Sequence, residues 1–115
     1  MAIFLCLLTF HIYHLCIFYT RGVSMNTISI DEVMKMDNPI IVDIRDNYSY
    51  NISHIKNSIN IPYYNLLSNF SHYLDKNKIY YLYCDEGRQS YEISKRLNSF
   101  GYRTLSISGG FISFR

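Results

Sequence analysis

The stretch IYYLYCDEGRQS, residues 79–90, gives the strongest indication of the fold class. It opens with an apolar run of the kind that forms strands buried on both faces of a parallel sheet. A helix from roughly Ser90 to Phe100 is predicted next, because apolar residues recur there at helical spacing. They are Ile93, Leu97 and Phe100. Gly101 follows, where a left-handed helix cap belongs.

Three more segments complete the predicted sheet. Residues 104–107 form a second, weaker strand after the helix, so the chain contains a strand–helix–strand unit, which implies parallel pairing with a right-handed crossover. The β-branched run 40–44 predicts another buried strand, and residues 59–61 a short one ended by Pro62. We therefore predict an α/β fold with a small central parallel sheet flanked by helices.

A short helix is predicted before the first of these strands. The residues Ser29 to Glu32 form a capping-box pattern, in which the serine hydroxyl accepts a hydrogen bond from the Glu32 amide. Ile30, Val33 and Met34 then give the helix one apolar stripe. The residues that end it are Asp37, Asn38 and Pro39.

Composition and charge exclude several classes of protein. The chain has 115 residues, enough for one domain, and its 49% hydrophobic and 17% charged residues exclude a disordered chain. The formal net charge is +2 and no Lys/Arg cluster is visible, so we expect no nucleic-acid partner. No His/Cys spacing typical of a metal site occurs, so we expect no metal.

Residues 1–24 form an apolar leader, and residues 25–115 form the predicted domain. The run from Ala2 to Tyr19 is about long enough to span a bilayer as a helix. It has three interpretations: a membrane anchor, sequence upstream of a natural start at Met25, or a buried helix of the domain. Cys6 and Cys16 lie in this run, and one thiol in the globular part builds no disulfide framework. We therefore expect a cytoplasmic protein, or alternatively a membrane-anchored one.

The one cysteine of the globular part, Cys84, is the candidate nucleophile. It lies at the carboxyl end of a predicted strand, where ligands gather in open α/β sheets. The candidate substrate-binding loop follows it: Asp85, Glu86, Gly87, Arg88, Gln89 and Ser90. Gly87 allows the backbone to turn inward, so that successive amide N–H groups and the helix dipole point at the sulfur. Such groups stabilise a thiolate and equally a bound persulfide, but also a phosphate ester.

Two sequence signatures in residues 27–114 resemble the rhodanese homology domain in its short single-domain form. The first signature comprises Ile41-Val42-Asp43-Ile44-Arg45, Tyr50, His54-Ile55 and Ile59-Asn60-Ile61-Pro62. The second comprises Tyr83-Cys84, Gly87, Ser90, Leu97, Gly101-Tyr102 and Gly109-Gly110-Phe111. Both keep the order of the family without a gap.

The resemblance implies a sulfurtransferase that carries sulfur on a Cys84 persulfide. The partners would be a small sulfane-sulfur donor and a thiol acceptor, which can be a protein, and no organic cofactor is implied. Outside the loop, we expect structural roles. Asp43 would anchor loops near the site, Arg45 would hold the segment 47–53 through hydrogen bonds, and His54 would satisfy backbone groups.

The chain departs from the family pattern within the loop. Gln89 occupies the usual place of an arginine, and Arg88 stands one position earlier. Asp85 and Glu86 add two carboxylates, which repel a dianion and oppose thiolate formation. We therefore expect weak activity with thiosulfate and better use of a less anionic persulfide donor. Earlier in the chain, Ser49 replaces the usual acid, which leaves Arg45 without its family partner.

Two other functions compete with sulfur transfer. A non-catalytic module with this fold would bind partners or sense redox state, although such a module has no need of Cys84. A phosphatase or an arsenate-reducing relative would need a longer loop with an arginine that closes on the oxyanion. Here Arg88 lies inside a loop of six residues, Cys84 through Gln89, so we expect a tetrahedral oxyanion to fit poorly.

Overall fold

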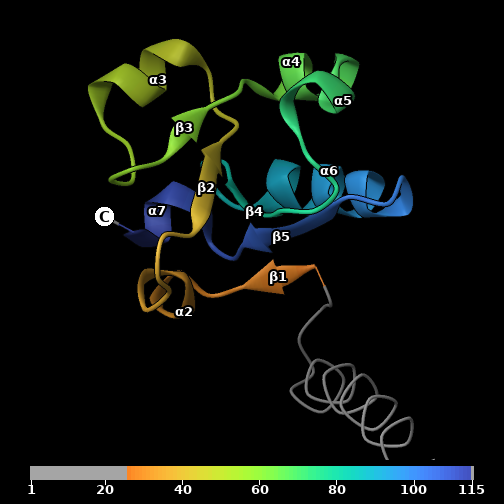
Figure 1. Ribbon diagram of the computed structural model, residues 1–115. Coiled ribbons are helices and arrows are strands. Elements are labelled where there is room, and N and C mark those ends of the chain that lie inside the picture. The colour runs from red at the N-terminus through yellow and green to blue at the C-terminus, as the bar shows by residue number, and fades with distance from the viewer. Residues whose placement is uncertain (1–25, 115) are drawn as a thin grey trace, which may run out of the picture.

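The computed structural model describes residues 26–114, and Figure 1 shows how its elements are arranged. The elements in chain order are β1 (Thr27–Ile28), α2 (Ile30–Met34), β2 (Ile40–Asp43), α3 (Asn47–Ile52), β3 (Ile59–Asn60), α4 (Tyr63–Ser68), α5 (Phe70–Tyr73), β4 (Ile79–Tyr83), α6 (Arg88–Ser99), β5 (Arg103–Ile107) and α7 (Gly110–Phe114). The strands form one parallel sheet in the order β1-β5-β4-β2-β3. The predicted α/β fold with a central parallel sheet is confirmed.

The two central strands, β2 and β4, are buried on both faces. Val42 pairs with Leu82, and Ile41 pairs with Tyr81. Because neighbouring residues of a strand point to opposite faces, these two pairs contribute to different sides of the sheet. Each side chain of the four is at most 9% exposed. This explains why the sequence of these strands is continuously apolar rather than alternating.

The two faces of the sheet carry separate hydrophobic clusters. One cluster contains Val42, Leu82 and buried residues of α4 and α6, among them Leu66, Ile93 and Leu97. The other contains Ile41, Tyr81, Ile107 and residues of α2 and α7, namely Val33 and Phe111. In Figure 1, α2 lies next to α7, and α4 lies next to α5. The sheet is therefore the middle of three layers, with helices on both sides.

The structure confirms the predicted cap at Ser29 and the predicted left-handed conformation of Gly101. The Ser29 hydroxyl accepts a hydrogen bond from the Glu32 amide at 3.2 Å and caps α2. Asn57 has a φ of +68°, a left-handed conformation that asparagine tolerates. Gly101 has a φ of +94° just after the end of α6.

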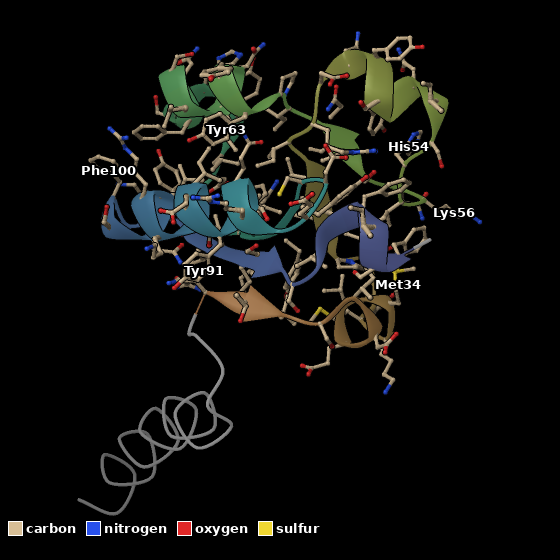
Figure 2. All side chains as sticks on the ribbon, turned by 180° about the vertical axis from the view of Figure 1, so that it is seen from behind. Met34, His54, Lys56, Tyr63, Tyr91 and Phe100 are labelled. Atoms are coloured by element: carbon tan, nitrogen blue, oxygen red, sulfur yellow. The ribbon has the colours of Figure 1, made fainter. Side chains whose placement is uncertain are left out.

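The helix predicted from roughly Ser90 to Phe100 corresponds to α6, whose two ends lie one or two residues earlier in the chain. The helix begins at Arg88 and ends at Ser99, so Phe100 no longer follows the helical register. Instead of lying on the buried face, Phe100 is 49% exposed and stacks on Phe70 with 5.1 Å between ring centroids. Figure 2 shows Phe100 at the outer end of α6, on the side where α4 and α5 lie. Strand β1 was not predicted, because two residues contain no periodicity.

The apolar run 2–19 lies outside the described residues, as does the predicted boundary between residues 24 and 25. Within residues 26–114, no helix has the length and apolar character needed to cross a bilayer.

Candidate active site

Cys84 lies directly after β4, near the middle of the sheet, because β4 has β2 on one side and β5 on the other. Its side chain is buried, with 4% of its surface exposed. The loop that follows leads into α6, and Gly87 is the N-cap of that helix with a φ of +99°. A side chain at Gly87 would be strained by this φ and would begin only 3.1 Å from the amide nitrogen of Gly109.

Two residues of its own loop, Gly87 and Ser90, place hydrogen-bond donors within 3.5 Å of the Cys84 sulfur. The Gly87 amide nitrogen lies 3.1 Å from Sγ, and the Ser90 amide nitrogen lies 3.5 Å away. The Ser90 hydroxyl oxygen is also 3.5 Å from Sγ. These groups present partial positive charge to the sulfur, which favours a negatively charged form of it. Successive amides were predicted to point at the sulfur, but the two loop amides that make this contact, from Gly87 and Ser90, are separated by two residues.

Helix α7 holds the loop from the other side. The Phe111 amide donates to the Cys84 carbonyl at 2.8 Å, and the Ile112 amide donates to the Asp85 carbonyl at 3.1 Å. Gly110 makes this approach possible, since a Cβ atom there would lie 2.5 Å from both carbonyl oxygens. Two backbone carbonyls of the loop therefore accept hydrogen bonds from α7. The Gly109-Gly110-Phe111 motif was identified in the sequence, but this contact was not.

A second buried hydroxyl extends the site into the domain. Ser106, on β5, is fully buried and lies 2.7 Å from the Ser90 hydroxyl, oxygen to oxygen. Both hydroxyls also lie near the Gly87 carbonyl oxygen, Ser90 at 3.2 Å and Ser106 at 3.5 Å. Ser106 was not predicted as part of the site, because a serine within a strand carries no signal of its own.

The other predicted loop residues lie at the surface. Asp85, Glu86, Arg88 and Gln89 are all exposed. Asp85 comes near a cation, since its Oδ1 atom lies 3.9 Å from Nη1 of Arg45. At this distance and exposure the ion pair is weak.

Asp43 and Arg45 form a buried ion pair next to the site. Asp43 is fully buried, Arg45 is 7% exposed, and Arg45 Nη2 lies 2.7 Å from Asp43 Oδ2. Arg45 also donates through Nε and its amide to the same carboxylate, and through Nη2 to the Ser53 carbonyl at 2.7 Å. Its guanidinium lies 4.1 Å from the centroid of the Phe111 ring. Arg45 thus connects the end of β2 with α7 and with the residue after α3.

Burial and pairing act in opposite directions on Arg45. Burial disfavours the charged form of the guanidinium and by itself would lower the pKa of Arg45. The hydrogen bonds to Asp43 and the charge of its carboxylate outweigh this effect, so the pKa of Arg45 lies above its ordinary value. Asp43 is therefore the partner that Arg45 has in place of an acid at position 49. Ser49 instead donates its amide to the Asp46 carboxylate at 2.7 Å, which caps α3 and lowers the pKa of Asp46.

His54 makes its contacts to Tyr50. Its Nδ1 atom lies 2.7 Å from the Tyr50 carbonyl oxygen, and the two rings stack with 3.8 Å between centroids. The side chain is exposed, and Figure 2 shows it at the edge of the domain near Lys56.

Tyr83, the residue before Cys84, is fully buried and hydrogen-bonded. Its hydroxyl accepts from the Ile55 amide at 3.1 Å and lies 3.2 Å from the Ser58 hydroxyl. Burial, reinforced by the nearby Asp43 carboxylate, raises the pKa of Tyr83 to about 12. The phenol is therefore neutral at physiological pH and fixes the end of β4. Within residues 26–114, no group of three or more His, Cys, Asp and Glu side chains is arranged to hold a metal ion.

Comparisons with curated proteins identify several relatives. The chain is 31% identical over 85 residues to the thiosulfate sulfurtransferase GlpE of Coxiella burnetii, covering 73% of this chain and 78% of that protein. It is 32% identical over 84 residues to the adenylyltransferase and sulfurtransferase uba4 of Ogataea parapolymorpha, covering 72% of this chain. A tRNA uridine(34) hydroxylase of Buchnera aphidicola is 24% identical over 99 residues, covering 81% of this chain. The chain spans only 22% of uba4 and 32% of the hydroxylase.

Solved structures show the same fold. A rhodanese-like domain protein from Staphylococcus aureus superposes with a TM-score of 0.71 at 25% identity, covering 79% of this chain and 92% of that protein. The family model of the rhodanese-like domain matches residues 29–115, which include the whole sheet except β1. The chain therefore belongs to the rhodanese-like domain family.

Proposed function

We propose that this protein is a sulfurtransferase that carries sulfane sulfur as a persulfide on Cys84. The observation that carries the proposal is the pair of amides, from Gly87 and Ser90, that lie 3.1 and 3.5 Å from Sγ. Similarity to GlpE and uba4, both named as sulfurtransferases, supports the same class of reaction. Residues 85–90 would form the substrate-binding loop around the sulfur.

The first half of the reaction loads the enzyme. The Cys84 thiolate attacks the outer sulfur of a persulfide donor, a new S–S bond forms, and the S–S bond of the donor breaks. The donor leaves as a thiolate, so charge and electrons balance without an external oxidant. The donors around Sγ stabilise the attacking thiolate first and the anionic persulfide afterwards.

The second half of the reaction unloads the enzyme. The thiolate of an acceptor, either a small thiol or a protein cysteine, attacks the outer sulfur of the Cys84 persulfide. A new S–S bond forms on the acceptor, and Cys84 is released as a thiolate. The hydrogen-bond donors of Gly87 and Ser90 stabilise anionic sulfur in both halves of the reaction, so the proposed mechanism requires no metal or organic cofactor.

The exposed carboxylates of Asp85 and Glu86 favour a donor with little negative charge. They stand in the loop that a donor must approach, and they repel the dianionic thiosulfate more than a persulfide. We therefore expect the purified protein to use low-molecular-weight persulfides faster than thiosulfate. Faster turnover of thiosulfate would contradict this preference.

Mass spectrometry tests the proposal directly. After incubation with a small persulfide donor, the intact protein should gain one sulfur atom, and peptide mapping should place it on Cys84. The Cys84→Ser variant, which keeps Cys6 and Cys16, is the matched control and should gain none at position 84. A protein that folds but gains no sulfur on Cys84 would refute sulfur transfer and favour a binding or redox-sensing module.

A further inference from the structure

Two hydroxyl pairs connect α6 with β5. Ser90 pairs with Ser106, and one helical turn later Ser94 pairs with Thr104, each with 2.7 Å between hydroxyl oxygens. All four residues are buried, with at most 3% of their surface exposed. Within the described residues, only the first pair reaches the sulfur of Cys84, through the Ser90 hydroxyl. The Ser94–Thr104 pair therefore serves as a control, because it joins the same helix and strand without contacting the sulfur.

The hydroxyl of Ser90 has one proton and several acceptors within reach. The Gly87 carbonyl oxygen lies at 3.2 Å, nearer than the Cys84 sulfur at 3.5 Å. That carbonyl already accepts the Tyr91 amide at 3.1 Å, as part of α6. Ser90 is therefore able to give its proton to the sulfur without leaving the carbonyl unsatisfied.

Ser106 affects how strongly the Ser90 hydroxyl donates a hydrogen bond to the sulfur. When the sulfur is anionic, the Ser106 hydroxyl donates to the Ser90 hydroxyl, and the Ser90 hydroxyl donates to the sulfur. A hydroxyl that accepts one hydrogen bond donates the next one more strongly. When the sulfur carries a proton, the direction can reverse, because Ser106 then has the Gly87 carbonyl oxygen at 3.5 Å as its acceptor.

We propose that Ser106 is a positioning residue for the sulfur site, acting on Cys84 through the hydroxyl of Ser90. Its hydroxyl accepts or donates according to the charge on the sulfur, and so stabilises the thiolate and the anionic persulfide from inside the domain. This role deepens the proposed sulfur transfer and rests on it for its use in catalysis.

The charged groups near the loop do not change in the test. They are Asp85, Glu86 and Arg88 of the loop and Arg45 beyond the end of β2, whereas α7 contains no charged residue. A difference between serine variants therefore reports on the hydroxyls and not on the surrounding charges.

The test compares Ser106→Ala with Ser94→Ala. The readout is the ultraviolet absorbance of the thiolate as a function of pH, after subtraction of the Cys84→Ser signal, which cancels Cys6 and Cys16. At about pH 7, we expect the thiolate fraction of Cys84 to fall about threefold in Ser106→Ala and to stay unchanged in Ser94→Ala. Urea denaturation should show similar losses of stability in both variants, because each loses one buried hydroxyl pair.

A double-mutant cycle separates this role from general packing. In a Ser90→Ala background, Ser106→Ala should have no further effect on the thiolate fraction, because the Ser90 hydroxyl that links Ser106 to the sulfur is gone. Equal effects of Ser106→Ala in both backgrounds, or equal effects of Ser106→Ala and Ser94→Ala, would overturn the proposal. The absorbance reports the charge on Cys84 whether or not sulfur is ever loaded, so failure of sulfur transfer and failure of this inference are distinguishable.

Discussion

Replacement of Gly110 by alanine would push a methyl group against the back of the Cys84 loop. The added Cβ would lie 2.5 Å from the carbonyl oxygens of Cys84 and Asp85, closer than such atoms approach in proteins. Because the obstacles are backbone atoms, no side-chain rotation relieves the contact. Either α7 or the loop must move, and both carry the hydrogen bonds that orient the loop.

The cost of Gly110→Ala has two parts. Gly110 has a φ of +61°, and a left-handed conformation costs a non-glycine residue about 1–2 kcal/mol. Forcing an extra methyl group into a packed site adds about 1–3 kcal/mol. We therefore expect the free energy of unfolding to fall by about 2–5 kcal/mol, which leaves most small domains folded.

Gly101→Ala is the matched control. Gly101 has a φ of +94°, farther from the left-handed minimum than Gly110, but an added Cβ would meet only the Lys76 side chain, at 3.6 Å or more. Strain without a clash should cost about 1–2 kcal/mol. Urea denaturation gives both losses of stability, and the rate of sulfur loading on Cys84 gives the functional effect.

We expect sulfur loading to slow about tenfold to a hundredfold in Gly110→Ala, since small displacements of reacting groups have effects of this size. Gly101→Ala should load at the parent rate. If Gly110→Ala were no less stable than Gly101→Ala, the close approach of α7 to the loop would not be a constraint. If it lost stability but loaded sulfur normally, α7 would support the fold and not the orientation of the loop.

Three further predictions concern the residues around the loop. Asp43→Asn leaves Arg45 buried without its charged partner and should lower the free energy of unfolding, measured by urea denaturation, by about 3 kcal/mol. The control Glu92→Gln breaks an exposed pair on α6 and should lower it by less than about 1 kcal/mol. Equal losses would contradict the structural role of the buried pair. The pKa of Tyr83 is raised to about 12, so its contribution to stability is complete below about pH 10 and is lost as the pH rises toward 12. The Tyr83→Phe variant should therefore lose less stability over this pH range than the parent protein. The same pH dependence in both proteins would refute the raised pKa of Tyr83. Asp85→Asn should raise the ratio of thiosulfate to persulfide turnover about threefold in steady-state kinetics, and an unchanged ratio would mean that the carboxylate does not select the donor.

Several features of this protein follow from local sequence alone. The strands 40–43 and 79–83 are continuously apolar because both of their faces are covered, and this pattern is visible without a structure. The cap at Ser29 and the left-handed Gly101 depend on one or a few neighbouring residues, so short-range patterns predict them. The end of α6 is different, because Phe100 has the right residue type but leaves the helix to stack on Phe70.

Local sequence patterns were sufficient to predict the fold class, the strand–loop–helix unit and the position of Cys84 at the carboxyl end of β4, because each of these depends on residues that are close in the chain. The groups outside the loop that support it became visible only in the tertiary contacts. Ser106 reaches Ser90 across 16 positions of sequence, and the α7 amide of Phe111 reaches the Cys84 carbonyl from beyond β5. Such contacts depend on how β5 and α7 pack against β4 and α6. No short-range pattern encodes that packing, since it is set by the burial of the whole sheet between its two layers of helices.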